Sequence, residues 1–254
     1  MKVSNSMDGG LMGLAIEAEY LVKRFGEILA LDDLSFVVKE GEIYGLIGPN
    51  GAGKTTALRI VGTIIKPTSG KVKIFGVDVV RDPSRIREMI SYLPEEASAY
   101  RNLSGLEYLR FMAKFYQREG REVDEMVEEG SRISGLKERL NDKVKGYSKG
   151  MNRRILVARV LTVKPRLAIM DEPTAGLDVV HALHVRQTIR EYVEKHRVTV
   201  LLSSHNMLEV EFLCDRVALI NNGRIIGEGS PEELKDKYKA KNLEEVFVEV
   251  MKVV

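Results

Sequence analysis

The sequence of 254 residues contains one cysteine and no tryptophan, and it has no long apolar run. A single cysteine, Cys214, excludes an internal disulfide framework and is typical of a reducing compartment. No apolar stretch approaches the ~18–20 residues that a helix needs to cross a bilayer. The polar, glycine-rich start "MKVSNSMDGGLMG" lacks the hydrophobic segment of a secretory signal. We therefore expect no membrane span, and we interpret residues 1–13 as a mobile tail.

The chain also has no large excess of positive or negative charge. Lys and Arg number 39 against 37 Asp and Glu, which leaves a net charge of +2. The total charge therefore gives no bias toward nucleic acid or acidic lipid, although a local basic patch stays possible. On this ground we expect no nucleic-acid partner. Hydrophobic residues make up 44% and charged residues 30%, which is typical of a globular chain.

The apolar pattern changes along the chain. Alternation over residues 15–22 and 34–39 predicts half-buried strands, whereas the continuous apolar run 42–47 predicts a strand buried on both faces. Helical spacing at Leu106, Leu109, Met112 and Tyr116 opens a helix-rich section. Three later apolar runs, at 167–170, 198–203 and 217–220, are separated by helical segments, and an Asn-Gly pair at 222–223 predicts a hairpin. This order predicts an α/β fold with a mainly parallel sheet.

The segment "IGPNGAGKTT" at residues 47–56 follows the buried strand and precedes a helix. Gly48, Gly53, Lys54 and Thr55 match the phosphate-loop pattern G-x-x-x-x-G-K-[ST]. In such a loop, backbone N–H groups and the helix N-terminus attract phosphate oxygens. We expect Lys54 to neutralise the β- and γ-phosphates, Thr55 to ligate Mg²⁺, and Thr56 to reach the α-phosphate. A plain connecting turn is the alternative.

Two acidic residues end the next buried run, "RLAIMDE". Asp171 could hold Mg²⁺ through water, and Glu172 could orient or deprotonate an attacking water. Paired acids also end strands at surfaces without any function. A phosphate loop in the same chain favours the catalytic interpretation.

Three longer segments show a family resemblance: "YSKGMNRRILVARVL", "DEPTAGLD" and "LLSSHNMLEVEFLCDRVALINNGRIIGEG". They resemble the signature segment, the joined Walker B and D-loop, and the H-loop region of ABC ATPases. The resemblance covers about residues 14 to 230. It implies a P-loop core with a mainly parallel sheet, an N-terminal antiparallel β-subdomain and a helical insertion. We expect the ATP-binding core at 14–94 and 163–230, the helical subdomain with the signature at 95–162, and a C-terminal helical tail at 231–254.

The resemblance also implies roles for individual residues. The ATP-binding set would be Phe25, which would stack on adenine, together with Gly48, Asn50, Gly51, Gly53, Lys54, Thr55 and Thr56. The catalytic set would be Lys54, Glu172 and His205, and the metal set Thr55, Asp171 and Glu95. Ser148, Lys149 and Gly150 would contact ATP held by a second copy, and Asp178 would bond across that dimer. A core phenylalanine, a core histidine and a solvent-facing lysine remain the alternatives for Phe25, His205 and Lys149.

Two departures from the family pattern stand out. Glu95 replaces the Q-loop glutamine, and its carboxylate could be a stronger Mg²⁺ ligand or could have a raised pKa. Lys149 and Met151 replace a glycine and a glutamine of the signature. The form "YSKGM", with "LEEVFVEV" at 243–250, resembles ATPase subunits of ABC-2-type exporters.

The resemblance therefore implies the Mg²⁺-dependent ATPase subunit of an exporter, at the cytoplasmic face of the membrane. Two such subunits, alike or different, would dimerise on ATP and drive a separate transmembrane permease. Tyr100, Leu103 and Tyr108 could form an apolar pocket for that permease or pack internally. A soluble family member, or a regulator that binds ATP without turnover, is the alternative. His181 and His184 are three residues apart, and we expect them on a solvated helix face rather than at a metal.

Overall fold

The computed structural model describes residues 13–116 and 119–253, so most of the expected N-terminal tail lies outside the described residues. The strands, in chain order, are β1 (Leu14–Phe25), β2 (Ile28–Lys39), β3 (Ile43–Ile47), β4 (Ser69–Ile74), β5 (Val77–Asp78), β6 (Ile90–Leu93), β7 (Leu167–Asp171), β8 (Thr199–Ser204), β9 (Arg216–Asn221) and β10 (Arg224–Gly229). The helices are α1 (Lys54–Val61), α2 (Pro83–Met89), α3 (Gly105–Phe115), α4 (Arg121–Ser134), the 3₁₀ turns η1 (Lys137–Asn141) and η2 (Val144–Gly146), α5 (Lys149–Thr162), α6 (Val179–His196), α7 (Met207–Leu213), α8 (Pro231–Tyr238) and α9 (Leu243–Val253).

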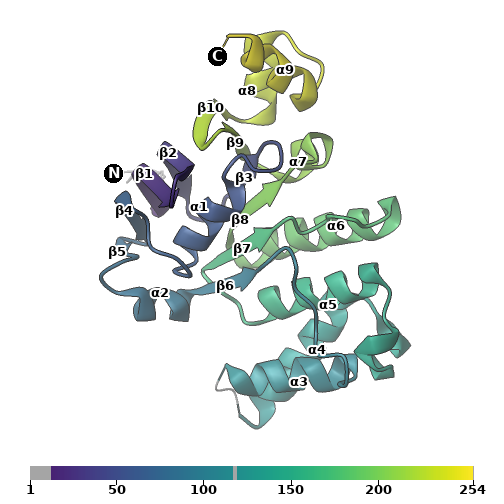
Figure 1. Ribbon diagram of the computed structural model, residues 1–254. Coiled ribbons are helices and arrows are strands. Elements are labelled where there is room, and N and C mark those ends of the chain that lie inside the picture. Colours follow the sequence, from purple (N-terminus) through teal and green to yellow (C-terminus); the bar gives the residue numbers. More distant parts are fainter. Residues whose placement is uncertain (1–12, 117–118, 254) are drawn as a thin grey trace, which may run out of the picture.

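The main sheet runs through the middle of the molecule (Figure 1) with the strand order β10-β9-β3-β8-β7-β6. The pairs β3–β8, β3–β9, β7–β8 and β6–β7 are parallel, and β10 is antiparallel to β9. Every residue of β3, β7 and β8 is buried. The continuous apolar runs thus form two-sided core strands, as expected for a parallel sheet.

A second sheet, with the order β2-β1-β4-β5, is antiparallel and stands beside the first. One hydrophobic core joins its inner face to α1 and to one face of the main sheet, through residues such as Leu34, Leu58 and Ile169. A second core lies on the other face of the main sheet and extends into α5, α6 and the helical section. The expected α/β fold with an antiparallel β-sheet is confirmed.

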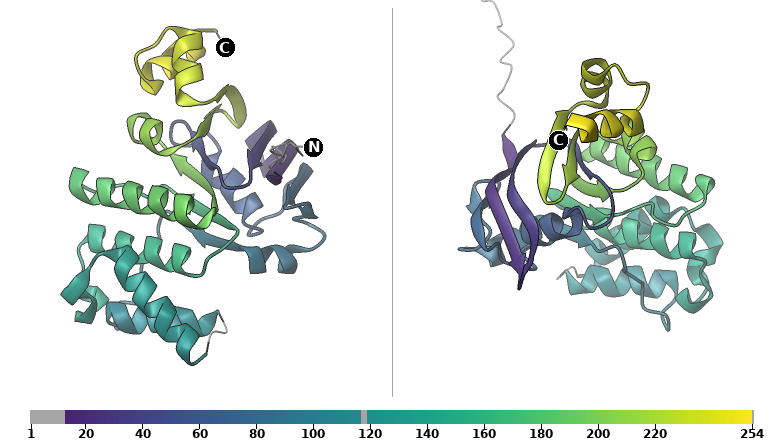
Figure 2. Two further views of the ribbon diagram at one scale, coloured as in Figure 1. Left: turned by 180° about the vertical axis from the view of Figure 1, so that it is seen from behind. Right: turned by 45° about the horizontal axis from the view of Figure 1, so that its top comes forward.

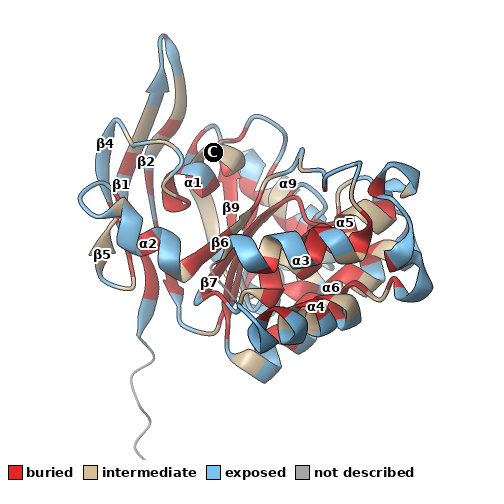
Figure 3. Ribbon diagram, turned by 90° about the horizontal axis from the view of Figure 1, so that it is seen from below, coloured by how far each residue is buried: buried red, intermediate tan, exposed pale blue. Residues whose placement is uncertain are grey.

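The helices α3, α4 and α5 form a section at one end of the sheet, seen from two further sides in Figure 2. Ser104 and Glu107 form a reciprocal capping box at the start of α3, which satisfies N–H groups that a helix start otherwise leaves unpaired. The outer faces of α3 and α4 are exposed and their inner faces buried, whereas α5 is largely buried (Figure 3). The helix α3 ends at Phe115, one residue before the predicted last contact at Tyr116.

The predicted Asn-Gly hairpin is present between β9 and β10. Asn222 has a φ of 47° and Gly223 a φ of 76°, which are the left-handed conformations that a tight two-residue hairpin turn requires. A Cβ on Gly223 would lie 2.8 Å from Leu31 Cα on β2, so the turn also packs closely against the second sheet. The expected C-terminal tail begins with α8, whose cap is Ser230.

The described residues include no helix that is long and apolar enough to span a membrane.

Candidate nucleotide-binding site

The phosphate loop connects the buried end of β3 to the first residue of α1. Gly51 and Gly53 have φ values of 80° and 107°, a region that glycine enters without strain. A Cβ on Gly48 would lie 2.1 Å from the carbonyl oxygen of Ile220 on β9. The loop geometry therefore depends on small residues at these positions, and it leads directly to the N–H groups at the start of α1.

A cleft of about 420 Å³ opens over this loop. It is lined by Ile28, Leu29, Ala30, Asn50, Gly51, Ala52, Gly53, Lys54, Thr55, Thr56, Glu95 and Glu172. The helix N-terminus at its floor favours an anion. The cleft thus collects the predicted loop residues other than Gly48, together with two predicted acidic residues from elsewhere in the chain.

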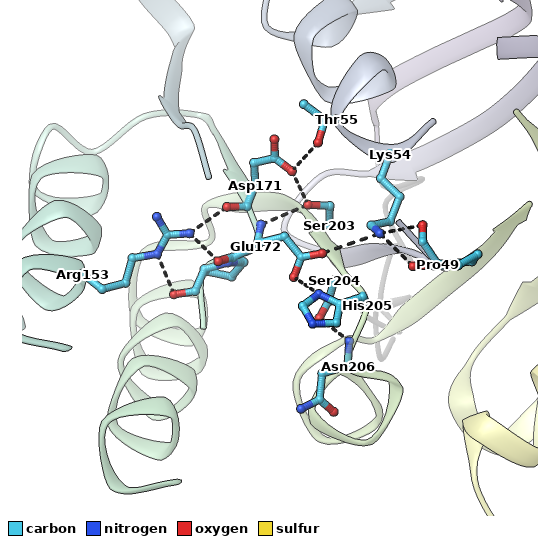
Figure 4. Close-up of polar contacts among 12 residues, drawn as sticks. Pro49, Lys54, Thr55, Arg153, Asp171, Glu172, Ser203, Ser204, His205 and Asn206 are labelled. Atoms are coloured by element: carbon cyan, nitrogen blue, oxygen red, sulfur yellow. Dashed lines mark hydrogen bonds and ion pairs between the residues drawn. The ribbon is translucent and has the colours of Figure 1, made fainter. Parts of the chain in front are cut away.

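Lys54 lies inside this cleft and is 6% exposed. Its Nζ donates to the carbonyl of Gly48 at 2.7 Å and to that of Pro49 at 3.1 Å. The same atom lies 3.6 Å from Glu172 Oε1 (Figure 4). The lysine is therefore held over the loop by neutral carbonyls and one carboxylate.

Asp171, at the end of β7, faces the first turn of α1. Thr55 Oγ1 donates to Asp171 Oδ1 at 3.1 Å, and Ser203 Oγ donates to the same oxygen at 2.6 Å. Asp171 is 1% exposed. Hydroxyl and carboxylate oxygens such as those of Thr55 and Asp171 are ligands that Mg²⁺ prefers, and Glu95 lines the same cleft as Thr55. The donor set fits the expected metal.

Glu172 follows Asp171 and has the left-handed φ of 51°. Its N–H is directed at Ser203 on the neighbouring strand β8, with the hydroxyl at 3.0 Å and the carbonyl at 3.2 Å. Its Oε2 lies 2.9 Å from His205 Nδ1. A buried carboxylate beside Lys54 and a half-exposed imidazole can accept a proton from a water in the cleft, so the arrangement suits hydrolysis of a bound phosphate ester.

The remaining predicted residues lie apart from this cleft. Phe25 does not belong to the described lining of the cleft, but Ile28, which pairs with Phe25 across the two strands, does. Ser148, Lys149 and Gly150 start the helix α5 and do not belong to the described cleft lining either. Asp178 caps α6, and its carboxylate accepts from the N–H and ring nitrogen of His181, which lowers the pKa of Asp178.

The expected solvated helix face is only partly present, because the His181 side chain is 29% exposed whereas Nε2 of His184 is buried. His181 packs over Gly150, where an added Cβ would lie 2.8 Å from the imidazole ring. His184 packs against Gly135, and its burial lowers its pKa. The turn between α4 and α5 and the start of α5 cover these positions, which the spacing within α6 alone could not reveal.

Two residues that support the site were not predicted. Ser203 bonds both acidic residues, and Arg153 on α5 bonds the carbonyls behind them. Ser203 ends the run "VTVLLS", which also contains Thr199, and Arg153 is the buried one of the three arginines of α5. The serine at the end of a buried run was a weak signal for Ser203, and the sequence alone does not separate Arg153 from the adjacent Arg154.

The comparison with family models decides the identity. The model described as "ABC transporter" matches residues 31–175, more than half of the chain. The chain belongs to the ABC transporter family. As a member, it is an ATP-binding and ATP-hydrolysing subunit.

Similar proteins are ABC transporter subunits. The ABC transporter ATP-binding protein NatA of Bacillus subtilis is 33% identical over 222 residues, which cover 87% of this chain and 90% of NatA. The daunorubicin/doxorubicin resistance ATP-binding protein DrrA of Streptomyces peucetius is 38% identical over 225 residues, covering 87% and 67%. The dimeric, post-hydrolysis structure of the ATP-binding cassette MJ0796 with ADP and Pi superposes with a TM-score of 0.77 at 27% identity, covering 85% of this chain and 98% of that chain. These similarities confirm the ABC ATPase fold.

Proposed function

We propose that this chain powers an ABC exporter by ATP-dependent dimerisation and Mg²⁺-dependent hydrolysis. The observation that carries the proposal is the assembled group of Lys54, Glu172 and His205 at the ATP cleft, within hydrogen-bond or ion-pair distance of one another. A subunit that only bound ATP would not need a buried carboxylate aimed at the phosphate position.

The residues of the cleft divide the work between them. The loop N–H groups and Lys54 hold the phosphates, because opposite charge and the helix dipole both favour them. Glu172 accepts a proton from the attacking water, and such general-base catalysis accelerates a reaction by ~10²–10⁴-fold. His205, bonded to Glu172, orients that carboxylate and contacts the terminal phosphate.

Mg²⁺ would be held by Thr55 and Asp171, with Glu95 as the additional ligand from the other side of the cleft. When bound, the ion offsets the negative charge that the phosphates carry during transfer. Ser203 keeps Asp171 Oδ1 facing Thr55 through its 2.6 Å hydrogen bond.

A second copy supplies the residues that the cleft does not contain. The start of α5 at Ser148, Lys149 and Gly150 presents helix N–H groups, a suitable site for a γ-phosphate. These residues lie outside the cleft of their own chain, so contact with ATP requires a partner. The structure of the MJ0796 cassette is a dimer bound to ADP and Pi, which supports this arrangement. Asp178 would bond across the same interface, and Phe25 would reach the adenine from the rim.

The exporter role rests on relatives and on one apolar surface. DrrA is named for drug resistance, and NatA is named as a transporter subunit. Tyr100 is 55% exposed and makes edge-to-face contacts with Phe111, itself 45% exposed, and with Tyr108. Tyr108 is buried, so that part of the expected pocket packs internally. A transmembrane permease would dock on the exposed pair, which places the chain peripherally at the cytoplasmic face.

The substitution Glu172→Gln tests the proposal. The amide keeps the size of the side chain but does not accept the proton, so turnover should fall by ~10²–10⁴-fold while ATP still binds. Glu232→Gln, on the exposed surface of α8, is the matched control. Light scattering with ATP and Mg²⁺ should show a dimer of the Glu172→Gln chain. Unchanged turnover, or a strict monomer at saturating ATP, contradicts the proposal.

A further inference from the structure

Arg153 lies on the inner side of α5, directly behind the two acidic residues of the ATP site. It is 6% exposed. Its Nε donates to the carbonyl of Pro173 at 3.0 Å, and its Nη2 donates to the carbonyl of Asp171 at 2.7 Å and to that of Glu172 (Figure 4). One guanidinium thus bonds three consecutive peptide units around the catalytic carboxylate.

The same side chain also reaches the loop after β6. Its Nη1 donates to the carbonyls of Pro94 at 3.2 Å and Glu95 at 3.1 Å. Burial lowers the pKa of Arg153, while the charges of Asp171, Glu95 and Glu172 raise it. A buried cation is tolerated only where hydrogen bonds satisfy it, and here backbone carbonyls from two loops do so.

This geometry bears on the conformation of Glu172. A glutamate with a φ of 51° is in an unfavourable region that persists only where the surroundings hold it. Ser203 holds the N–H of Glu172 from β8, and Arg153 holds the carbonyls on both sides of the residue from α5. The left-handed turn aims the carboxylate into the cleft, toward Lys54 and His205.

We propose that Arg153 is a positioning residue for ATP hydrolysis: it holds the peptide units of Glu172 in the left-handed turn and connects them to the Glu95 loop and to the signature helix. The inference rests on the proposed role of Glu172 as general base. Arg153 lies five positions after Ser148 on one continuous helix. If ATP bound to a partner displaces the signature residues at the start of α5, Arg153 on the same helix moves with them and so does its contact with the Glu172 peptide units.

The test compares Arg153→Met, Arg153→Lys and Arg153→Gln in the full chain. Arg154→Met is the matched control, because Arg154 is the next residue on α5 and donates instead to the Ser134 carbonyl at 2.8 Å. ATP affinity is measured by titration, and kcat and KM by steady-state ATPase assays. We expect Arg153→Met to lower kcat at least about tenfold with KM and ATP affinity nearly unchanged, since the lost interaction acts in the transition state.

Arg153→Lys should recover part of kcat, because a lysine donates to some of these carbonyls but cannot span both loops. If Arg153→Met fails to fold, the kcat values of Arg153→Lys and Arg153→Gln test the inference instead. On a Glu172→Gln background, Arg153→Lys should lower the residual turnover by no more than about twofold, because residues that act as a unit are not additive.

The inference is overturned by a kcat within about twofold of wild type in all Arg153 variants, by a loss confined to KM, or by an equal loss in Arg154→Met. A fully additive effect with Glu172→Gln also overturns it. Failure of the proposed function can be told apart from failure of this inference, because ATP turnover would then survive the single substitution Glu172→Gln.

Discussion

Replacing Ser203 by alanine is the sharpest test of how the site is held together. The Ser203 hydroxyl is fully buried; it donates to Asp171 Oδ1 at 2.6 Å and accepts from the N–H of Glu172 at 3.0 Å. Alanine removes both contacts without adding volume. The Glu172 N–H keeps the Ser203 carbonyl at 3.2 Å, and Asp171 Oδ1 keeps the Thr55 hydroxyl at 3.1 Å.

The expected loss of stability follows from these contacts. A hydrogen bond to a charged acceptor contributes ~1.5–3 kcal/mol, and the partners that remain place the net loss near the lower end, about 2 kcal/mol. In a chain of 150–250 residues each kcal/mol shifts Tm by ~2–4 °C. Ser203→Ala should therefore lower Tm by about 4–8 °C, and kcat should fall as well because Asp171 is no longer oriented.

The assay is calorimetric unfolding without nucleotide, beside the neighbouring substitution Ser204→Ala. Ser204 is similarly buried, but its hydroxyl accepts from a neutral group, the N–H of Asn206 at 3.0 Å. A neutral hydrogen bond contributes ~0.5–1.5 kcal/mol, so the control should shift Tm by a smaller amount. If Ser203→Ala shifts Tm no more than Ser204→Ala, the charge-assisted bond to Asp171 is not what holds the site.

Three further outcomes are expected. Glu95→Gln should raise the Mg²⁺ concentration for half-maximal ATPase activity, because a carboxylate binds the ion more strongly than an amide; superimposable titration curves would exclude Glu95 as a ligand. Gly48→Ala should weaken ATP binding by about tenfold or more in calorimetric titration, because its Cβ would meet a β9 carbonyl at 2.1 Å, whereas Gly146→Ala, with open space around its Cβ, should not. Burial and the neighbouring Glu228 carboxylate raise the pKa of Tyr44. Above pH ~10 the tyrosine therefore ionises in the unfolded chain before it does in the folded chain, and the free energy of unfolding of the wild type should fall more steeply with pH than that of Tyr44→Phe. Denaturation midpoints of the two proteins that change in parallel between pH ~9 and ~11 would contradict this.

Much of the fold could be predicted because its signals are local. The runs that became β3, β7 and β8 are apolar except for polar residues at their ends, and only a strand covered on both faces keeps such a run out of water. The phosphate loop was predictable for the same reason: Gly48 to Thr55 are adjacent in sequence and determine their own backbone. The hairpin at Asn222 needed no distant partner to be predicted either.

The errors and omissions concern contacts between distant segments. Tyr108 and His184 each lie on a helix face that another element covers, and helical spacing does not say which face that is. Ser203 and Arg153 act on Glu172 from a neighbouring strand and a distant helix, 31 and 19 positions away in the chain. Such supports follow from strand order and helix packing, which a single sequence does not specify.

The ion pair between Lys54 and Glu172 has a consequence for the subunit without bound nucleotide. Both side chains are nearly buried, and each is the other's counter-ion at 3.6 Å. If Glu172 is the general base, as proposed, an arriving triphosphate would compete for the Lys54 ammonium group and leave the Glu172 carboxylate without its counter-ion. The availability of this carboxylate for water activation would then depend on whether nucleotide is bound.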